Sequence, residues 1–130
     1  MSNIINIDGK NFKTKVEKLQ GWMVMTFYQN GTDNCNDTIA AMDNVSAAMD
    51  PFYVDNKKIV FGKFYVTDPN SKDEKIISKL NVGVLPCIII FYNGKEKARV
   101  VGVKNEKEIK QLIKENMKEE KLSEIDYHTY

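Results

Sequence analysis

Two cysteines carry the most reactive side chains of this sequence. Cys35 follows a polar loop and begins an apolar stripe at helical spacing, and Cys87 directly follows Pro86 and opens an apolar run. Thiols can exchange with disulfides, pair with each other or bind a metal ion. The one histidine, His128, lies far along the chain, and two cysteines with one distant histidine do not make a zinc site. We therefore expect no metal and no cofactor, and any chemistry to be thiol chemistry.

Length and composition are those of an ordinary small globular protein. The chain has 130 residues, so we expect a single domain over residues 1–130, with a core at about 3–118 and a tail at 119–130. The net charge of +1 gives no reason to expect a nucleic-acid or membrane-surface partner, and we favour a monomer. No apolar run approaches the ~20 residues of a membrane-spanning helix. The sequence shows no export signal, which together with only two cysteines predicts a reducing, cytoplasmic location.

The apolar pattern predicts an alternating α/β order that positions these thiols. Strands are expected at 3–7, 22–28, 58–67, 87–92 and 96–101, and helices at 10–20, 35–50, 71–80 and 105–118. Gly62 marks either a bulge or a buried run in the third strand. Asn93-Gly94 is the best hairpin signal in the chain. The order β-α-β-α-β-α-β-β-α predicts an α/β fold with a largely parallel but mixed central sheet, helices on both faces and an antiparallel edge.

This order, with a hairpin just before the last helix, resembles thioredoxin over about residues 10–118. Five local matches support the resemblance. Before the active-site loop stands Thr26-Phe27-Tyr28, and Lys63 lies where the family often has a buried lysine. Residues 82–86 are similar to the segment that ends in a cis-proline, 88–95 to the next strand and turn, and Val101-Gly102 to the late glycine beside the active site. The resemblance implies the thioredoxin fold and a cis peptide bond before Pro86.

The chain departs from thioredoxins where their chemistry is done. Their Cys-x-x-Cys motif corresponds here to Thr32-Asp33-Asn34-Cys35, their buried aspartate to Thr26, and their two active-site tryptophans to Tyr28 and Gly31. Exchange begins when a thiolate attacks a disulfide, and a threonine hydroxyl cannot form a disulfide. Ordinary dithiol exchange through residues 32 and 35 is therefore excluded. The stretch at 50–58 is also longer than in bacterial thioredoxins.

Two interpretations of Cys35 remain open. It is an inert, buried thiol, or it takes part in exchange, either paired with Cys87 or with a small thiol such as glutathione. The resemblance implies that the cis-proline loop packs against the start of the second helix, which would bring the two sulfurs within disulfide range. The spliceosomal thioredoxin-like proteins resemble this chain here, because they lack the first cysteine, keep one near the second position and place Cys after Pro. Their role lies in a protein assembly.

Two functions follow from these interpretations. The first is a binding module for a protein or peptide in extended conformation, at a groove that the resemblance places along the cis-proline loop. The residues expected to line this groove are Tyr28, Gly31, Thr32, Leu85, Pro86 and Gly102. The alternative is a divergent thiol-disulfide oxidoreductase that uses Cys35 with Cys87, or Cys35 alone, with Thr32 in place of the nucleophilic cysteine.

Overall fold

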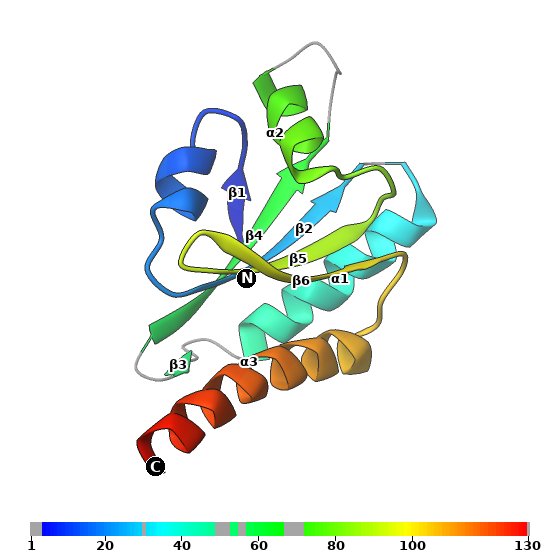
Figure 1. The fold of residues 1–130 in the computed structure, drawn as a ribbon. Helices are drawn as coiled ribbons and strands as arrows, with labels where there is room; N and C mark the ends of the chain where they lie inside the picture. Colours follow the sequence, from blue (N-terminus) through cyan, green and yellow to red (C-terminus); the bar gives the residue numbers. More distant parts are fainter. Residues whose placement is uncertain (1–3, 30, 49–52, 55–56, 67–71, 130) are drawn as a thin grey trace.

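The computed structural model describes residues 4–29, 31–48, 53–54, 57–66 and 72–129 (Figure 1). Its elements in chain order are β1 (Ile5–Ile7), the π-helix η1 (Lys13–Glu17), β2 (Trp22–Tyr28), α1 (Asp33–Ala48), β3 (Tyr53–Val54), β4 (Lys57–Tyr65), α2 (Lys72–Leu80), β5 (Cys87–Tyr92), β6 (Lys95–Val101) and α3 (Glu106–Thr129). The predicted α/β class is confirmed. The short strand β3, inside the long 50–58 stretch, is an addition to the predicted order.

The strands form one six-stranded sheet in the order β1-β4-β2-β5-β6, with β3 paired to β4. The pairs β1–β4 and β2–β4 are parallel, whereas β5 runs antiparallel to both β2 and β6. The expectation of a largely parallel sheet is therefore wrong at β5. The register gives the reason: β4 leaves the sheet at Tyr65 beside Tyr28, and β5 enters it at Cys87 beside Phe27, at the same end. The connection through α2 thus returns the chain without crossing the length of the sheet.

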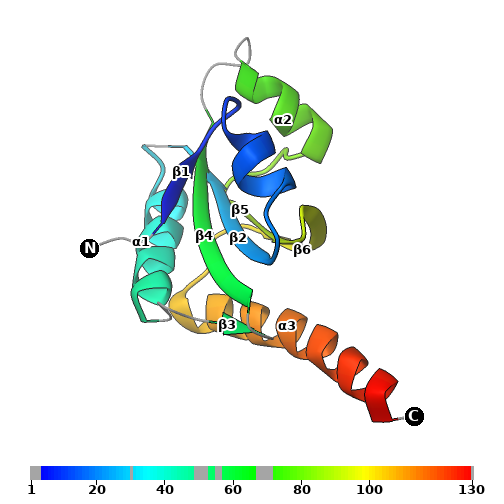
Figure 2. The same ribbon diagram turned by 90° about the vertical axis from the view of Figure 1, so that its left-hand side faces the viewer.

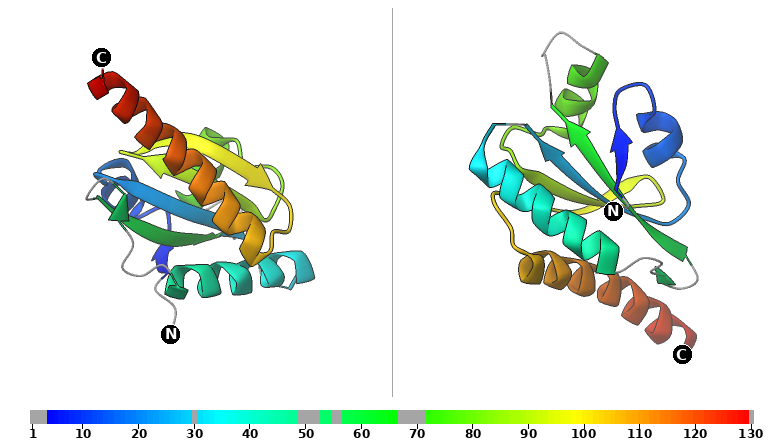
Figure 3. Two further views of the ribbon diagram at one scale, coloured as in Figure 1. Left: turned by 90° about the horizontal axis from the view of Figure 1, so that it is seen from below. Right: turned by 180° about the vertical axis from the view of Figure 1, so that it is seen from behind.

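Helices cover both faces of the sheet, as the alternating pattern predicts. Figure 2 shows α1 on one side and η1 with α2 on the other. Successive residues of β2 face opposite layers, since Val24 packs with Met42 of α1 and Ile113 of α3, whereas Met25 packs with Val16 of η1. Helices α1 and α3 lie on the same face of the sheet and contact each other there (Figure 3). A strand buried on both faces explains the continuous apolar run of β2.

Two glycines of the sheet, Gly94 and Gly62, each meet a local steric requirement. Asn93 and Gly94 both have positive φ, at 50° and 80°, which fits the tight turn of the predicted hairpin. Gly62 marks no bulge, because β4 pairs without a break along β2 from Ile59 to Tyr65. A Cβ atom at Gly62 would lie 3.0 Å from Sδ of Met23, so the glycine makes room for a core methionine.

The helix ends differ from the expected boundaries in two places. Helix η1 is shorter than 10–20, because the Asp8 carboxylate accepts the backbone N–H groups of Lys10 and Asn11 and holds those residues in a turn. Helix α3 continues to Thr129, through the expected tail at 119–130, where the sequence has no glycine or proline to stop it. The expected start of the 71–80 helix at Ser71, and the expected end of the 35–50 helix at Asp50, lie outside the described residues.

Candidate functional site

The residues expected to line a groove come from four segments at one end of the sheet. Tyr28 ends β2, Gly31 and Thr32 lie between β2 and α1, Leu85 and Pro86 precede β5, and Gly102 follows β6. The strand register sets this arrangement, because Phe27 pairs with Cys87 and Cys87 pairs with Val101. The structure therefore brings all four segments and both cysteines to one region. Figure 1 shows these strand ends converging toward the first turn of α1.

Thr32 serves as the N-cap of α1. Its hydroxyl accepts the backbone N–H of Cys35 at 3.4 Å, and its carbonyl accepts the N–H of Asn36 at 3.0 Å. A side-chain oxygen at this position pairs one of the N–H groups that the helix itself leaves unpaired. The residue that the resemblance aligns with the nucleophilic cysteine of thioredoxins is thus an exposed helix cap.

Cys35 is a buried, free thiol in the first turn of α1. Only 2% of its surface is exposed, and its sulfur accepts the backbone N–H of Gln29 at 3.5 Å. A thiol that is covered and hydrogen-bonded in this way cannot approach an external disulfide without a local opening of the structure. This placement fits the interpretation of Cys35 as an inert thiol.

Cys87 is the more deeply buried thiol, with no exposed surface. Burial raises the pKa of its thiol, Arg99 opposes this by lowering the pKa, and Glu96 raises it further. Its side chain packs with Ile89 and Phe91 on the sheet face covered by η1 and α2, whereas α1 covers the opposite face. Both cysteines are free in this structure, so a Cys35–Cys87 bridge stays a prediction.

The loop that precedes β5 has the backbone geometry that the resemblance implies. The Leu85–Pro86 peptide bond is cis, and the carbonyl of Pro86 accepts the backbone N–H of Gly102 at 2.8 Å. Gly31 and Gly102 both have positive φ, and a Cβ atom built at either would enter open space. Apart from the chain neighbours of each glycine, no heavy atom of the described residues lies within 4 Å of either Cβ position.

Thr26 occupies the position of the family's buried aspartate and brings no carboxylate to the site. Its side chain is fully buried, and its hydroxyl is a buried polar atom without a hydrogen-bond partner within the described part of the chain. Lys63, its neighbour in the register, is half-buried. A hydroxyl of ordinary acidity cannot take a proton from Cys35 as a carboxylate could. The described residues also contain no group of three or more histidine, cysteine or acidic side chains arranged to hold a metal ion.

Exposed apolar side chains surround this end of the sheet, and the sequence analysis missed them. They are Tyr65, Val84, Val101 and Val103, with 40%, 57%, 49% and 44% of their surfaces exposed. The ring of Tyr65 lies against that of Tyr28, with centroids 5.4 Å apart. In the sequence only their position could have indicated them, because Val84, Val101 and Val103 lie next to Leu85 or Gly102.

Comparisons with known proteins agree with this architecture. The sequence profile described as Thioredoxin matches residues 3–115. Thioredoxin f2 of Chlamydomonas reinhardtii has a similar structure, with a TM-score of 0.70 and 18% sequence identity over 86% of this chain and 94% of that one, which shows a shared fold. No match is found among curated protein sequences. No helix in the described residues is long and apolar enough to cross a membrane. With the profile spanning nearly the whole chain and the fold in agreement, this chain belongs to the thioredoxin family.

Proposed function

We propose that this protein binds an extended segment of a partner protein noncovalently, across the Leu85–Pro86 loop. The observation that supports this most is the distribution of exposed apolar surface. Over residues 4–29, 31–48, 59–66 and 75–117, where the structure describes side-chain burial, the large hydrophobic side chains that are exposed lie at or within three residues of strand ends on this side of the sheet: Tyr65, Val84, Val101 and Val103. Apolar surface gathered in one region is typical of a protein-interaction site, whereas single scattered residues are not.

The backbone of the loop is also available to a partner. Within the described part of the chain, the N–H and carbonyl groups of Gly83, Val84 and Leu85 have no protein hydrogen-bond partner. An extended peptide can pair with such groups as a short added strand, while its side chains contact the valines on either side. The open space above Gly31 and Gly102 leaves room for the peptide backbone.

The alternative, a divergent oxidoreductase, has less support. The capping role of Thr32 leaves no thiol at the exposed start of α1. Cys35 and Cys87 are both buried, and the raised pKa of Cys87 keeps it in the unreactive thiol form at neutral pH. Thiol exchange would require an opening that exposes one of them.

The proposal predicts that peptides without cysteine bind this surface. Short random peptides that lack cysteine would be selected on the wild-type protein by phage display, and the most enriched one synthesised. We expect Val84→Lys and Val103→Lys each to weaken its binding by about tenfold or more, because a buried valine contributes roughly 1.5–3 kcal/mol. Fluorescence anisotropy measures the affinities.

Ala48→Lys is the matched control, since it adds the same charge to an exposed residue at the far end of α1. Gly102 is left unchanged because its φ of 92° would strain any side chain. Failure to enrich any cysteine-free peptide, or equal weakening by all three lysine variants, would contradict the proposal.

A further inference from the structure

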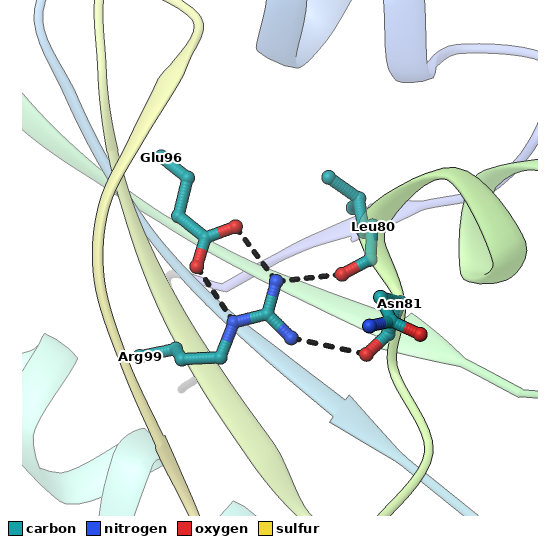
Figure 4. Close-up of polar contacts among 4 residues, drawn as sticks. All are labelled: Leu80, Asn81, Glu96 and Arg99. Atoms are coloured by element: carbon teal, nitrogen blue, oxygen red, sulfur yellow. Dashed lines mark hydrogen bonds and ion pairs between the residues drawn. The ribbon is translucent and has the colours of Figure 1, made fainter.

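The side chain of Arg99 makes four hydrogen bonds, and the proposed site does not yet account for them. Its Nε and Nη2 atoms donate to the two carboxylate oxygens of Glu96 at 2.6 and 2.7 Å. Nη2 also donates to the carbonyl of Leu80 at 2.6 Å, and Nη1 donates to the carbonyl of Asn81 at 3.2 Å. Figure 4 shows the guanidinium between the carboxylate on one side and these two carbonyls on the other.

An irregularity in β6 makes this arrangement possible. Residues three apart in a regular strand face opposite sides of the sheet. Here the β5–β6 register shifts between Ile90 and Phe91, so that Arg99 pairs with Ile89 and Glu96 pairs with Phe91. Ile89 and Phe91 face the same layer, and the extra residue in β6 therefore brings Glu96 and Arg99 to that face together.

The two carbonyls that Arg99 binds belong to the C-terminus of α2. Asn81 adopts a left-handed φ of 57°, the N–H of Val82 donates to the carbonyl of Ile77, and the N–H of Asn81 donates to that of Ser78. This is the Schellman pattern of a helix end, which still leaves the last carbonyls unpaired. A guanidinium supplies those carbonyls with donors and places a positive charge at the negative end of the helix dipole.

The loop that follows is attached at its start to β6 and at its end to Gly102, the residue directly after β6. Arg99 holds Leu80 and Asn81 at its start, and the N–H of Gly102, three residues further along, holds the carbonyl of Pro86 at its end. Gly83, Val84 and Leu85 lie between these two attachments and, among the described residues, make no backbone hydrogen bond to the protein.

We propose that Arg99, oriented by Glu96, is the positioning residue that sets the path of the Val82–Leu85 segment and so determines how well this segment pairs with a bound peptide. The effect of Arg99 on peptide binding rests on the proposed function. The position of the loop, in contrast, is a property of the free protein. Arg99 touches no peptide in this account, and its effect on binding passes through the loop.

The test compares Arg99→Met with Lys95→Met, which removes the same charge from an exposed residue of the same strand. We expect Arg99→Met to shift the amide resonances of Val82 to Leu85, to speed hydrogen exchange at the Val82 amide, which donates to the carbonyl of Ile77, and to weaken binding of the selected cysteine-free peptide by about three- to tenfold. Lys95→Met should do none of these. Arg99→Lys should show smaller changes in both measurements, since its ammonium group can bind one carbonyl. It cannot bind Glu96 and both carbonyls at once, as the guanidinium does.

Ile113→Val provides a second control, because it lowers global stability from the opposite layer and should leave peptide affinity unchanged. If the loop amides and peptide affinity of Arg99→Met match those of Lys95→Met, the proposal is wrong. Should Arg99→Met fail to fold, Arg99→Lys and Glu96→Gln decide the matter by the same two measurements. If the wild-type protein binds no peptide, the proposed function fails, while the loop amides still show whether Arg99 positions the loop.

Discussion

At the scale of single residues, the site is defined by what Thr32 does in place of a sulfur nucleophile. Its hydroxyl caps α1 by accepting the N–H of Cys35, so the side chain at residue 32 already lies next to Cys35. The helix N-terminus that would stabilise a thiolate at this position is intact. Thr32 therefore stands at an intact helix start but presents a hydroxyl and a methyl group where the resemblance places a thiol.

Thr32→Cys should accordingly create a dithiol with reductase activity. We expect this variant to reduce a model disulfide substrate in the presence of dithiothreitol faster than the uncatalysed reaction, while the wild-type protein does not. Thr32→Ser is the control, because it keeps the cap and adds no thiol. A wild-type rate equal to that of Thr32→Cys would show that the missing cysteine is not what limits exchange.

The thiols of the site could be found from the sequence, whereas the exposed valines and the residues that position the loop could not. Cys35 and Cys87 stand out by their thiol chemistry, whereas Thr32 is found only through the resemblance to thioredoxin. The exposure of Val84 and Val103 depends on the fold, since a valine in a loop has the same signature whether it is buried or exposed. Glu96 and Arg99 are even less visible, because their spacing predicts opposite faces of a regular strand and only the register shift unites them.

At the scale of elements, local apolar patterns predict the positions of the strands, but they do not predict the direction in which each strand runs. Strands β2 and β5 agree with the expected 22–28 and 87–92, because continuous apolar runs mark strands buried on both faces. The direction of β5 depends on where α2 returns the chain, which no local pattern encodes. The end of α3 was missed because a mixed charged segment without glycine or proline resembles a tail as much as a helix.

The Asn105–Glu108 pair forms the capping box that its spacing predicts. The N–H of Glu108 donates to the Asn105 side chain at 2.8 Å, and the N–H of Asn105 donates to the Glu108 carboxylate at 3.1 Å. We expect Asn105→Ala to lower the free energy of unfolding by about 1 kcal/mol. Urea denaturation measures it, with Lys110→Ala as the control on an exposed face of the same helix. A loss no larger than that of the control would mean that the cap adds nothing to stability.

At the scale of the whole molecule, the thioredoxin fold gathers the residues of the proposed binding surface at one end of its sheet. The fold brings the cis-proline loop, the start of α1 and the end of β6 together through the strand register. Both thiols are buried there, whereas four large apolar side chains are exposed, namely Tyr65, Val84, Val101 and Val103. A second surface competes for the role of binding site, the groove between β6 and α3 that is lined by Val100, Gln111 and Leu112 among others.

The most direct measurement is therefore to map where a peptide binds. The ¹⁵N-labelled wild-type protein would be titrated with the selected cysteine-free peptide while its amide resonances are followed. The account predicts the largest changes at Thr32, Leu85 and Val103 and their immediate neighbours. Changes confined to Val100, Gln111 and Leu112, or no saturable change at all, would contradict it.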